Sequence, residues 1–253
     1  MPNYTATALV IHRINLAEND RILTLYTPEH GKFSVVAKGA RRPTSKFSGA
    51  SDLFMLFRAL LATGKSLDIL SQCEILQSYS SLRYDLQRLA RATYFCELLD
   101  RFTMERDPVN SESLFQLTTI ALTLLQEPHA NPDIITHAFE LRLLAEQGYS
   151  PISDACVRCG EVVERRQVGF SPSLGGVLCA SDRYRVEDAV SLSAEALEVL
   201  QALPEIDGEE LMGLQPSTKA MHELDRALRW YIKLRAERDI KSAEFLDQLR
   251  ANR

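Results

Sequence analysis

Apolar and polar positions alternate in short runs along the first 80 residues, in the manner of half-buried β-strands. In one run, Phe33, Val35 and Ala37 fall on one side while Lys32 and Lys38 fall on the other, as in a sheet with one face in water. The runs that predict strands are residues 4–14, 21–27, 32–38, 52–59 and 66–78. Five short strands without a helix long enough to cover them predict a small closed barrel. The OB-fold is the commonest such barrel that binds nucleic acid, but this pattern does not separate it from an SH3-like barrel.

From Ser80 the apolar residues recur at the spacing of amphipathic helices. A helix that starts near residue 131 has clear start and stop signals, with Asn131 as N-cap, Pro132 in the first turn and Gly148 beyond the end. After a cysteine-bearing segment the helical pattern returns. The block 80–150 is predicted to be helical, with stretches at residues 80–102 and 111–126 and a third from Asn131 that ends before Gly148. The later stretches are residues 193–203, about 217–237 and 242 to the end.

Charge is unevenly distributed along the chain. The net charge of −5 argues at first against a nucleic-acid partner. Residues 1–80, however, hold nine Lys or Arg and six Asp or Glu, a net charge of +3, which leaves −8 for the remainder. Within residues 31–65, seven basic residues accompany the single acid Asp52. Such a concentration attracts phosphate within a Debye length of about 8–10 Å.

The sequence indicates a cytoplasmic protein without membrane partners. No apolar stretch reaches the roughly 18 residues of a membrane span, and the first residues are too polar for a signal peptide. An odd count of five cysteines indicates reduced thiols rather than a disulfide framework. P-loop, GxGxxG, HExxH and GxSxG motifs are absent from the sequence, so we predict no catalytic residues and no enzymatic activity.

The most informative segment is the basic loop predicted at residues 37–46. It carries four cations around Gly39, Thr44 and Ser45, and cations with hydroxyl groups can grip phosphate oxygens. These cations are Lys38, Arg41, Arg42 and Lys46. The alternative is a solvated basic loop that binds nothing.

Several short segments stand in an order that points to one protein family. They are Ala8–Ile11, Glu18–Leu23, Gly31-Lys32, Ala37–Arg42 with Ser45-Lys46, Phe139–Leu144 before Gly148–Pro151, the Cys-x-x-Cys at 156–159, and Lys241-Ser242 with Phe245-Leu246. In this order they resemble the RecO family of bacterial recombination mediators, and the resemblance covers nearly the whole chain.

The resemblance implies an OB-fold barrel followed by a helical domain. It also implies binding to single- and double-stranded DNA, annealing of complementary strands, and help for RecA in replacing single-strand-binding protein at the nucleoid, with RecR as a partner. The DNA-binding residues would then be Arg13, Arg21, Lys32, Lys38, Arg41, Arg42 and Lys46. Base stacking by Tyr26, Phe33 or Phe47 stays open, because these side chains could equally belong to the core.

Three cysteines form a candidate metal site. Cys156 and Cys159 form a Cys-x-x-Cys pair, and Cys179 is followed at the corresponding position by Asp182. Three thiols and a carboxylate are weaker evidence for one structural zinc than four thiols. His129 or His222 could complete the site instead, or the segment could be a zinc-ribbon remnant without metal.

A late helix carries Lys219, Arg226, Arg229 and Lys233 on one face, at steps of seven, three and four residues. Leu224, Leu228 and Tyr231 line another face. The resemblance implies that this helix docks the acidic C-terminal tail of single-strand-binding protein. An ordinary amphipathic surface helix, with an ion pair from Asp225 to Arg229, explains the pattern equally well.

The predicted fold is α+β and multidomain. It has a five-stranded OB-fold β-barrel (1–79), a helical domain in two parts (80–151 and 191–253) and a zinc-ribbon-like insertion (152–190). A DNA-binding mediator is the first functional hypothesis. The alternatives are a protein-interaction scaffold whose barrel does not bind DNA, and a zinc-ribbon enzyme or RNA factor.

Overall fold

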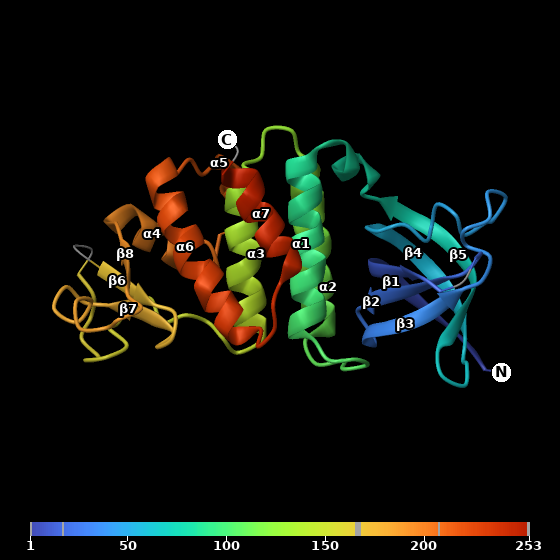
Figure 1. Cartoon of the computed structure of the whole chain (residues 1–253), viewed down its shortest axis with the longest axis horizontal. Coiled ribbons are helices and arrows are strands. Elements are labelled where there is room, and N and C mark those ends of the chain that lie inside the picture. The colour runs from blue at the N-terminus through green and yellow to red at the C-terminus, as the bar shows by residue number, and fades with distance from the viewer. Residues whose placement is uncertain (1, 17, 165–167, 207, 252–253) are drawn as a thin grey trace. The chain divides into compact units, whose positions relative to one another are not determined.

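The five N-terminal strands close into a barrel in this computed structural model, which describes residues 2–16, 18–164, 168–206 and 208–251 (Figure 1). The order around the barrel is β1-β2-β3-β5-β4, with β3 and β5 parallel and the other neighbours antiparallel. The strands are β1 (Asn3–Asn15), β2 (Arg21–Thr27), β3 (Gly31–Ala37), β4 (Met55–Ala62) and β5 (Asp68–Ser78). The five predicted strands are confirmed.

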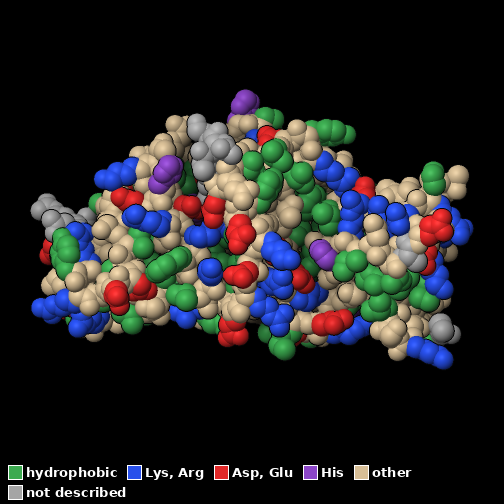
Figure 2. All heavy atoms as spheres, viewed as in Figure 1, with side chains coloured by type: hydrophobic (Ala, Val, Ile, Leu, Met, Phe, Trp, Pro, Cys, Tyr) green, Lys and Arg blue, Asp and Glu red, His purple; other side chains and the backbone are tan. Residues whose placement is uncertain are grey.

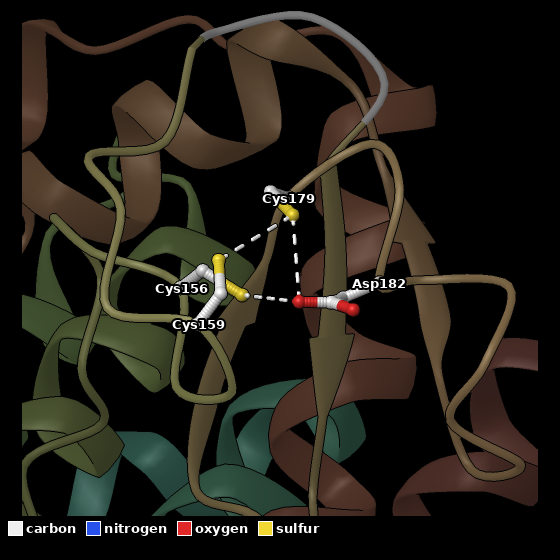
Figure 3. Close-up of side chains that lie close together, drawn as sticks. All are labelled: Cys156, Cys159, Cys179 and Asp182. Atoms are coloured by element: carbon white, nitrogen blue, oxygen red, sulfur yellow. Dashed lines mark hydrogen bonds between the residues drawn. The ribbon is translucent and has the colours of Figure 1, made fainter.

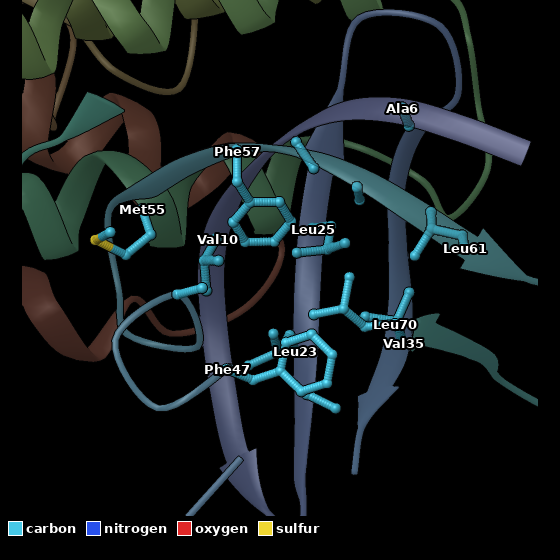
Figure 4. Packing of buried hydrophobic residues seen from close by; sticks show 14 of the residues in the cluster. Ala6, Val10, Leu23, Leu25, Val35, Phe47, Met55, Phe57, Leu61 and Leu70 are labelled. Carbon is cyan, nitrogen blue, oxygen red and sulfur yellow. The ribbon is translucent and has the colours of Figure 1, made fainter. Parts of the chain in front are cut away.

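Alternation along each strand decides which side chains fill the barrel. Phe33, Val35 and Ala37 of β3 are buried, whereas Lys38 is exposed. The three buried side chains pack with apolar side chains from the other strands, and Figure 4 labels several residues of this core. Because burying one large apolar side chain stabilises a protein by about 1.5–3 kcal/mol, this interior is the main source of the barrel's stability.

The long β3–β4 loop, residues 38–54, covers part of the barrel through successive turns. Ala40, Phe47 and Ala50 point inward and belong to the barrel core. Phe54 has a φ of 65° and donates its N–H to the Val10 carbonyl at 3.0 Å, so the backbone turns there. The fourth strand therefore begins at residue 55, and its predicted start at residue 52 was wrong.

The barrel belongs to a compact unit formed by residues 1–126 and 245–253. Asp85 caps its first long helix, because the carboxylate accepts the N–H groups of Gln87 and Arg88 at 2.8 and 3.1 Å. The helical elements are η1 (Ser80–Tyr84), α1 (Leu86–Phe102), α2 (Ser111–Gln126) and the later residues of α7 (Lys241–Ala251).

The α1–α2 loop is bonded to the barrel through a buried carboxylate. Asp68 of β5 accepts hydrogen bonds from Tyr4 and Arg106, both at 2.6 Å, and from the Gly64 N–H at 3.1 Å. The Arg106 guanidinium also lies over the Phe33 ring, 5.0 Å from its centroid. These contacts fix the loop against strands that are distant from it in sequence.

The second compact unit covers residues 127–244. Its α3 is capped as predicted, since the Asn131 side chain accepts the Asp133 N–H at 3.0 Å and Gly148 follows the helix with a φ of 75°. A small antiparallel sheet in the order β7-β6-β8 packs beside α6. The elements are α3 (Pro132–Glu146), β6 (Val168–Ser171), β7 (Gly176–Leu178), β8 (Val190–Leu192), α4 (Ala194–Ala202), α5 (Gly208–Gly213) and α6 (Thr218–Arg235).

These elements confirm the α+β class, whereas the predicted domain division stays a prediction. Within the part of the chain that the structure describes, no helix is both long and apolar enough to cross a membrane.

Candidate nucleic-acid interface and metal centre

Strand register brings predicted DNA-binding residues to one end of the barrel. Arg21 begins β2 and is paired with Ala37, the last residue of β3, so Lys38 follows at the same end. Arg13 lies near the end of β1 and is paired with Leu23. The ends of β1 and β3 and the start of β2 therefore lie at the same end of the barrel.

Hydrogen bonds to the β1–β2 hairpin hold the basic loop at this end of the barrel. Gly39 donates its N–H to the Asp20 carboxylate at 2.7 Å, and Arg41 donates its N–H to the Asn19 carbonyl at 2.9 Å. Gly39 has a φ of 67°, which glycine adopts without strain. The backbone is thereby fixed while the side chains of this segment reach into water, namely those of Lys38, Arg41 and Arg42.

Lys46 lies at the same end of the barrel. Its ammonium group donates to the Ser71 carbonyl at 2.9 Å and lies 4.9 Å from the centre of the Phe47 ring. Because Val36 is paired with Ile69 in the parallel register, Ser71 lies beside the end of β3. The structure thus gathers six of the seven predicted residues, and the exception is Lys32.

Lys32 lies at the opposite end of β3 and is occupied by structural contacts. Its ammonium group donates to the Asp100 and Thr103 carbonyls, the latter at 2.8 Å, and is 3.1 Å from the Asp100 carboxylate. Only 15% of the side chain is exposed. Lys32 connects the barrel to the end of α1 through these contacts. Because its ammonium group is already bonded within the protein, Lys32 does not belong to the proposed interface.

Arginine side chains converge on the one acid of the basic region. The Asp52 carboxylate is hydrogen-bonded to Arg13 and lies 3.2 Å from Arg21 and 3.0 Å from Arg83. Arg83 was not predicted as a site residue, since it follows the last strand and looks like part of the next helix. Acidic and basic side chains are interspersed over the face shown in Figure 2.

The aromatic residues considered for base stacking are unavailable. Tyr26, Phe33 and Phe47 are all buried. Burial raises the pKa of Tyr26, and the Asp107 charge raises it further. Tyr84, which directly follows Arg83, is instead 93% exposed. This ring could not be singled out from the sequence because its position fits the predicted helical pattern.

The structure brings the predicted metal ligands together (Figure 3). One ligand atom from each of Cys156, Cys159, Cys179 and Asp182 lies within 4.8 Å of the others. The Cys159 and Cys179 sulfurs are 3.9 Å apart, and one Asp182 oxygen is 3.6 and 3.7 Å from the sulfurs of Cys156 and Cys179. A tetrahedral zinc ion with Zn–S bonds of about 2.3 Å separates its sulfurs by about 3.8 Å, so these spacings fit the ion. Neither His129 nor His222 belongs to this group among the described residues.

Tight turns aim the thiols at this common point. The Gly160 N–H donates to the Cys156 carbonyl at 2.8 Å, and Gly160 has a φ of 78°. The Arg183 N–H closes the matching turn on the Cys179 carbonyl at 3.1 Å. Desolvation alone would raise the pKa of Asp182, but hydrogen bonds from the neighbouring thiols and the nearby Arg158 charge lower it below its usual value. An ionised carboxylate is the form that ligates a metal.

Helix α6 does not present the apolar face expected for a peptide. Leu224, Leu228 and Tyr231 are buried, because this face packs against α3, α4 and β8. A short sequence pattern cannot distinguish a helix face in a core from one that lines a groove.

An exposed hollow of about 580 Å³ lies instead at the end of α6. Its apolar lining comes from Trp230 and Leu234, which are 54% and 50% exposed. Of the four predicted cations, only Lys233 lines it, 3.7 Å from Asp239, and Arg238 and Glu237 add one charge of each sign. Lys219 and Arg226 are exposed elsewhere on the helix, and Arg229 is mostly buried, 3.8 Å from Asp225.

Comparisons with known proteins are consistent over the whole chain. A family model described as "Recombination protein O N terminal" matches residues 1–79, and one described as "Recombination protein O C terminal" matches residues 83–244. A "DNA repair protein RecO" from Symbiobacterium thermophilum is 44% identical over 255 residues and covers 100% of both chains. Proteins of the same name from Desulforamulus reducens and Bifidobacterium adolescentis are 34% and 35% identical, over 98% of this chain and 96% and 100% of theirs.

Proposed function

The chain belongs to the RecO family of recombination and DNA repair proteins, and from this premise we propose that it is a non-enzymatic recombination mediator. It binds single- and double-stranded DNA, promotes annealing of complementary strands and assists RecA loading onto DNA covered by single-strand-binding protein. RecR is its partner in the loading of RecA. The observation that carries the proposal is the gathering of six predicted cations at one end of the barrel.

The barrel is an OB-fold. The strand order β1-β2-β3-β5-β4, closed by a parallel pair between β3 and β5, supports this assignment over the SH3-like alternative. OB-folds bind nucleic acid on their strands and neighbouring loops, and the basic β3–β4 loop lies in such a position.

The mechanism is electrostatic. Fixed cations neutralise backbone phosphates of two strands, which lowers the repulsion between the strands and lets complementary bases meet. The loop backbone is bonded to the hairpin before DNA arrives. Binding therefore orders side chains only, and it weakens as salt rises.

The cluster of three cysteines and Asp182 holds one structural zinc ion. Its spacing fits tetrahedral coordination, and the turns around Gly160 and Arg183 support it. When bound, the ion would cross-link the two turns of the 152–190 insertion.

The acidic tail of single-strand-binding protein docks at the end of α6. Trp230 and Leu234 offer an apolar surface, and two cations, Lys233 and Arg238, lie beside it together with two acids, Glu237 and Asp239. The exposed apolar pair suits an aromatic end of a short peptide, and a peptide carboxylate would take the place of Asp239, 3.7 Å from the Lys233 ammonium group.

Strand annealing in the presence of single-strand-binding protein tests the mediator function. The double charge reversal, Arg41→Glu with Arg42→Glu, should lower the annealing rate and the DNA affinity by at least tenfold at about 50 mM salt. The matched control is Arg58→Glu with Lys65→Glu, which makes the same charge change on exposed barrel positions elsewhere. Negligible oligonucleotide binding by the unaltered protein, with no change in the Arg41→Glu and Arg42→Glu variant, would instead favour the scaffold hypothesis. Equal losses in both variants would show that the basic loop is not the site of binding.

A further inference from the structure

Three arginines that come from different elements share one carboxylate at the basic end of the barrel. Arg13 from β1 and Arg21 from β2 contact one Asp52 oxygen, and Arg83 from η1 contacts the other at 3.0 Å. Three guanidinium groups with one carboxylate leave two positive charges uncompensated.

Neighbouring groups hold the arginines in this geometry. Arg21 donates to the Ser51 hydroxyl at 2.7 Å, and Arg83 donates to the Leu53 carbonyl at 2.6 Å. The cluster is still open to water, because all four charged side chains are partly exposed. The structure thus holds three guanidinium groups in place around one anionic group.

A carboxylate and a phosphate group present similar oxygen pairs to guanidinium donors. We propose that the arginine cluster formed by Arg13, Arg21 and Arg83 binds one backbone phosphate of single-stranded DNA, and that Asp52 occupies this subsite when DNA is absent. Asp52 acts as a built-in competitor, which orients the arginines and lowers their affinity for DNA. This inference rests on the proposed function and extends the interface beyond the barrel strands.

The proposed subsite extends to Tyr84. It is adjacent to Arg83 in the chain, and consecutive Cα atoms are only about 3.8 Å apart. A ring that is 93% exposed makes few contacts within the protein. Beside a phosphate held by Arg83, it provides a stacking surface for the attached base, which any base can use.

Fluorescence anisotropy with oligothymidylate of about 20 nucleotides over a salt series tests the subsite. Asp52→Asn keeps an oxygen for the arginines but removes the competing charge, so affinity should rise about threefold to tenfold. Arg83→Gln should lower affinity by a similar factor and make the salt slope shallower by about 0.7. Tyr84→Leu should lower affinity without changing the salt slope.

Glu74→Gln is the matched control for Asp52→Asn. Glu74 is also paired with an arginine on the barrel, Arg58 at 3.7 Å, but lies outside the cluster. An Asp52→Asn variant that binds no more tightly than Glu74→Gln overturns the subsite. Unchanged affinity and salt slope in Arg83→Gln overturn it independently, even if Asp52→Asn perturbs folding.

Failure of the proposed function and failure of the arginine subsite would give different results. If the unaltered protein does not bind the oligonucleotide, the proposed function itself is wrong. If Arg41→Glu with Arg42→Glu abolishes binding but Asp52→Asn and Arg83→Gln have no effect, DNA binding stands and only the arginine cluster is excluded.

Discussion

Two aspartates of the barrel show how surroundings decide what a carboxylate does. Asp52 is partly exposed and shares its charge among three arginines. Asp68 is buried and accepts hydrogen bonds from Tyr4, Arg106 and Gly64. Desolvation opposes ionisation of Asp68, but the hydrogen bonds from Tyr4 and Arg106 outweigh it and lower its pKa below the usual value. The pKa of Tyr4 rises to about 12 through burial and its bond to Asp68, so Tyr4 remains a donor.

Asp68→Asn should therefore destabilise the protein in a pH-dependent way. A folded-state pKa below the unfolded value of about 3.9 gives stability that is present above that pH and lost as pH falls through the folded pKa. We expect a loss of about 1–3 kcal/mol at neutral pH that shrinks below about pH 4. Urea unfolding at both pH values measures it, with the exposed Glu18→Gln as control. A loss of equal size at both pH values would contradict this account.

At the scale of elements, local pattern predicts strands and helices well. Alternation in β3 and the capping signals at Asn131 and Gly148 are properties of adjacent residues, so sequence reveals them. The Phe54 turn that delays β4 is set by a bond to Val10, far away in the chain, and was missed for that reason.

The same distinction holds for the candidate sites. The cysteine spacing predicted the ligand group, including Asp182. Charge counting found most of the cations but could not show that Lys32 bonds to Asp100 and Thr103. It also missed Arg83, whose role depends on a tertiary contact with Asp52. Sequence supplies residue types, and register and closure decide which of them meet.

The cysteine turns make a testable prediction about the 152–190 insertion. Protein purified without chelator should contain about one equivalent of zinc, and Cys179→Ser should lose it because three donors hold the ion poorly. Asp182→Cys, which restores a four-thiol site, should release zinc more slowly to a chelator. Mass spectrometry measures the zinc content of all three proteins, and the rate of zinc transfer to a coloured chelator measures release. Less than about a tenth of an equivalent in the unaltered protein would refute the site.

For the whole molecule, opposite local charges matter more than the net value of −5. The barrel's basic end and the hollow at the end of α6 belong to different compact units and use different residues. Polynucleotide and acidic peptide are both anionic, but the sites proposed for them share no residue.

We therefore expect DNA and tail peptide to bind without competing. Trp230→Ala should weaken binding of an acidic peptide with a C-terminal aromatic residue by at least tenfold, through loss of an exposed apolar contact, while DNA affinity stays unchanged. Titration calorimetry with the peptide, with and without saturating oligonucleotide, measures both effects. Mutual exclusion of the two ligands would show that they share one site.

The inward residues of the β3–β4 loop separate two tasks that are often combined in one segment. Ala40, Phe47 and Ala50 anchor the backbone in apolar surroundings, and Lys38 and Arg42 are exposed. We expect that Lys38 and Arg42 can be substituted one at a time without a change in the path of the chain, whereas Lys46 is bonded to the Ser71 carbonyl at 2.9 Å. Such variants should form a series of graded affinities for polynucleotide on one unaltered backbone.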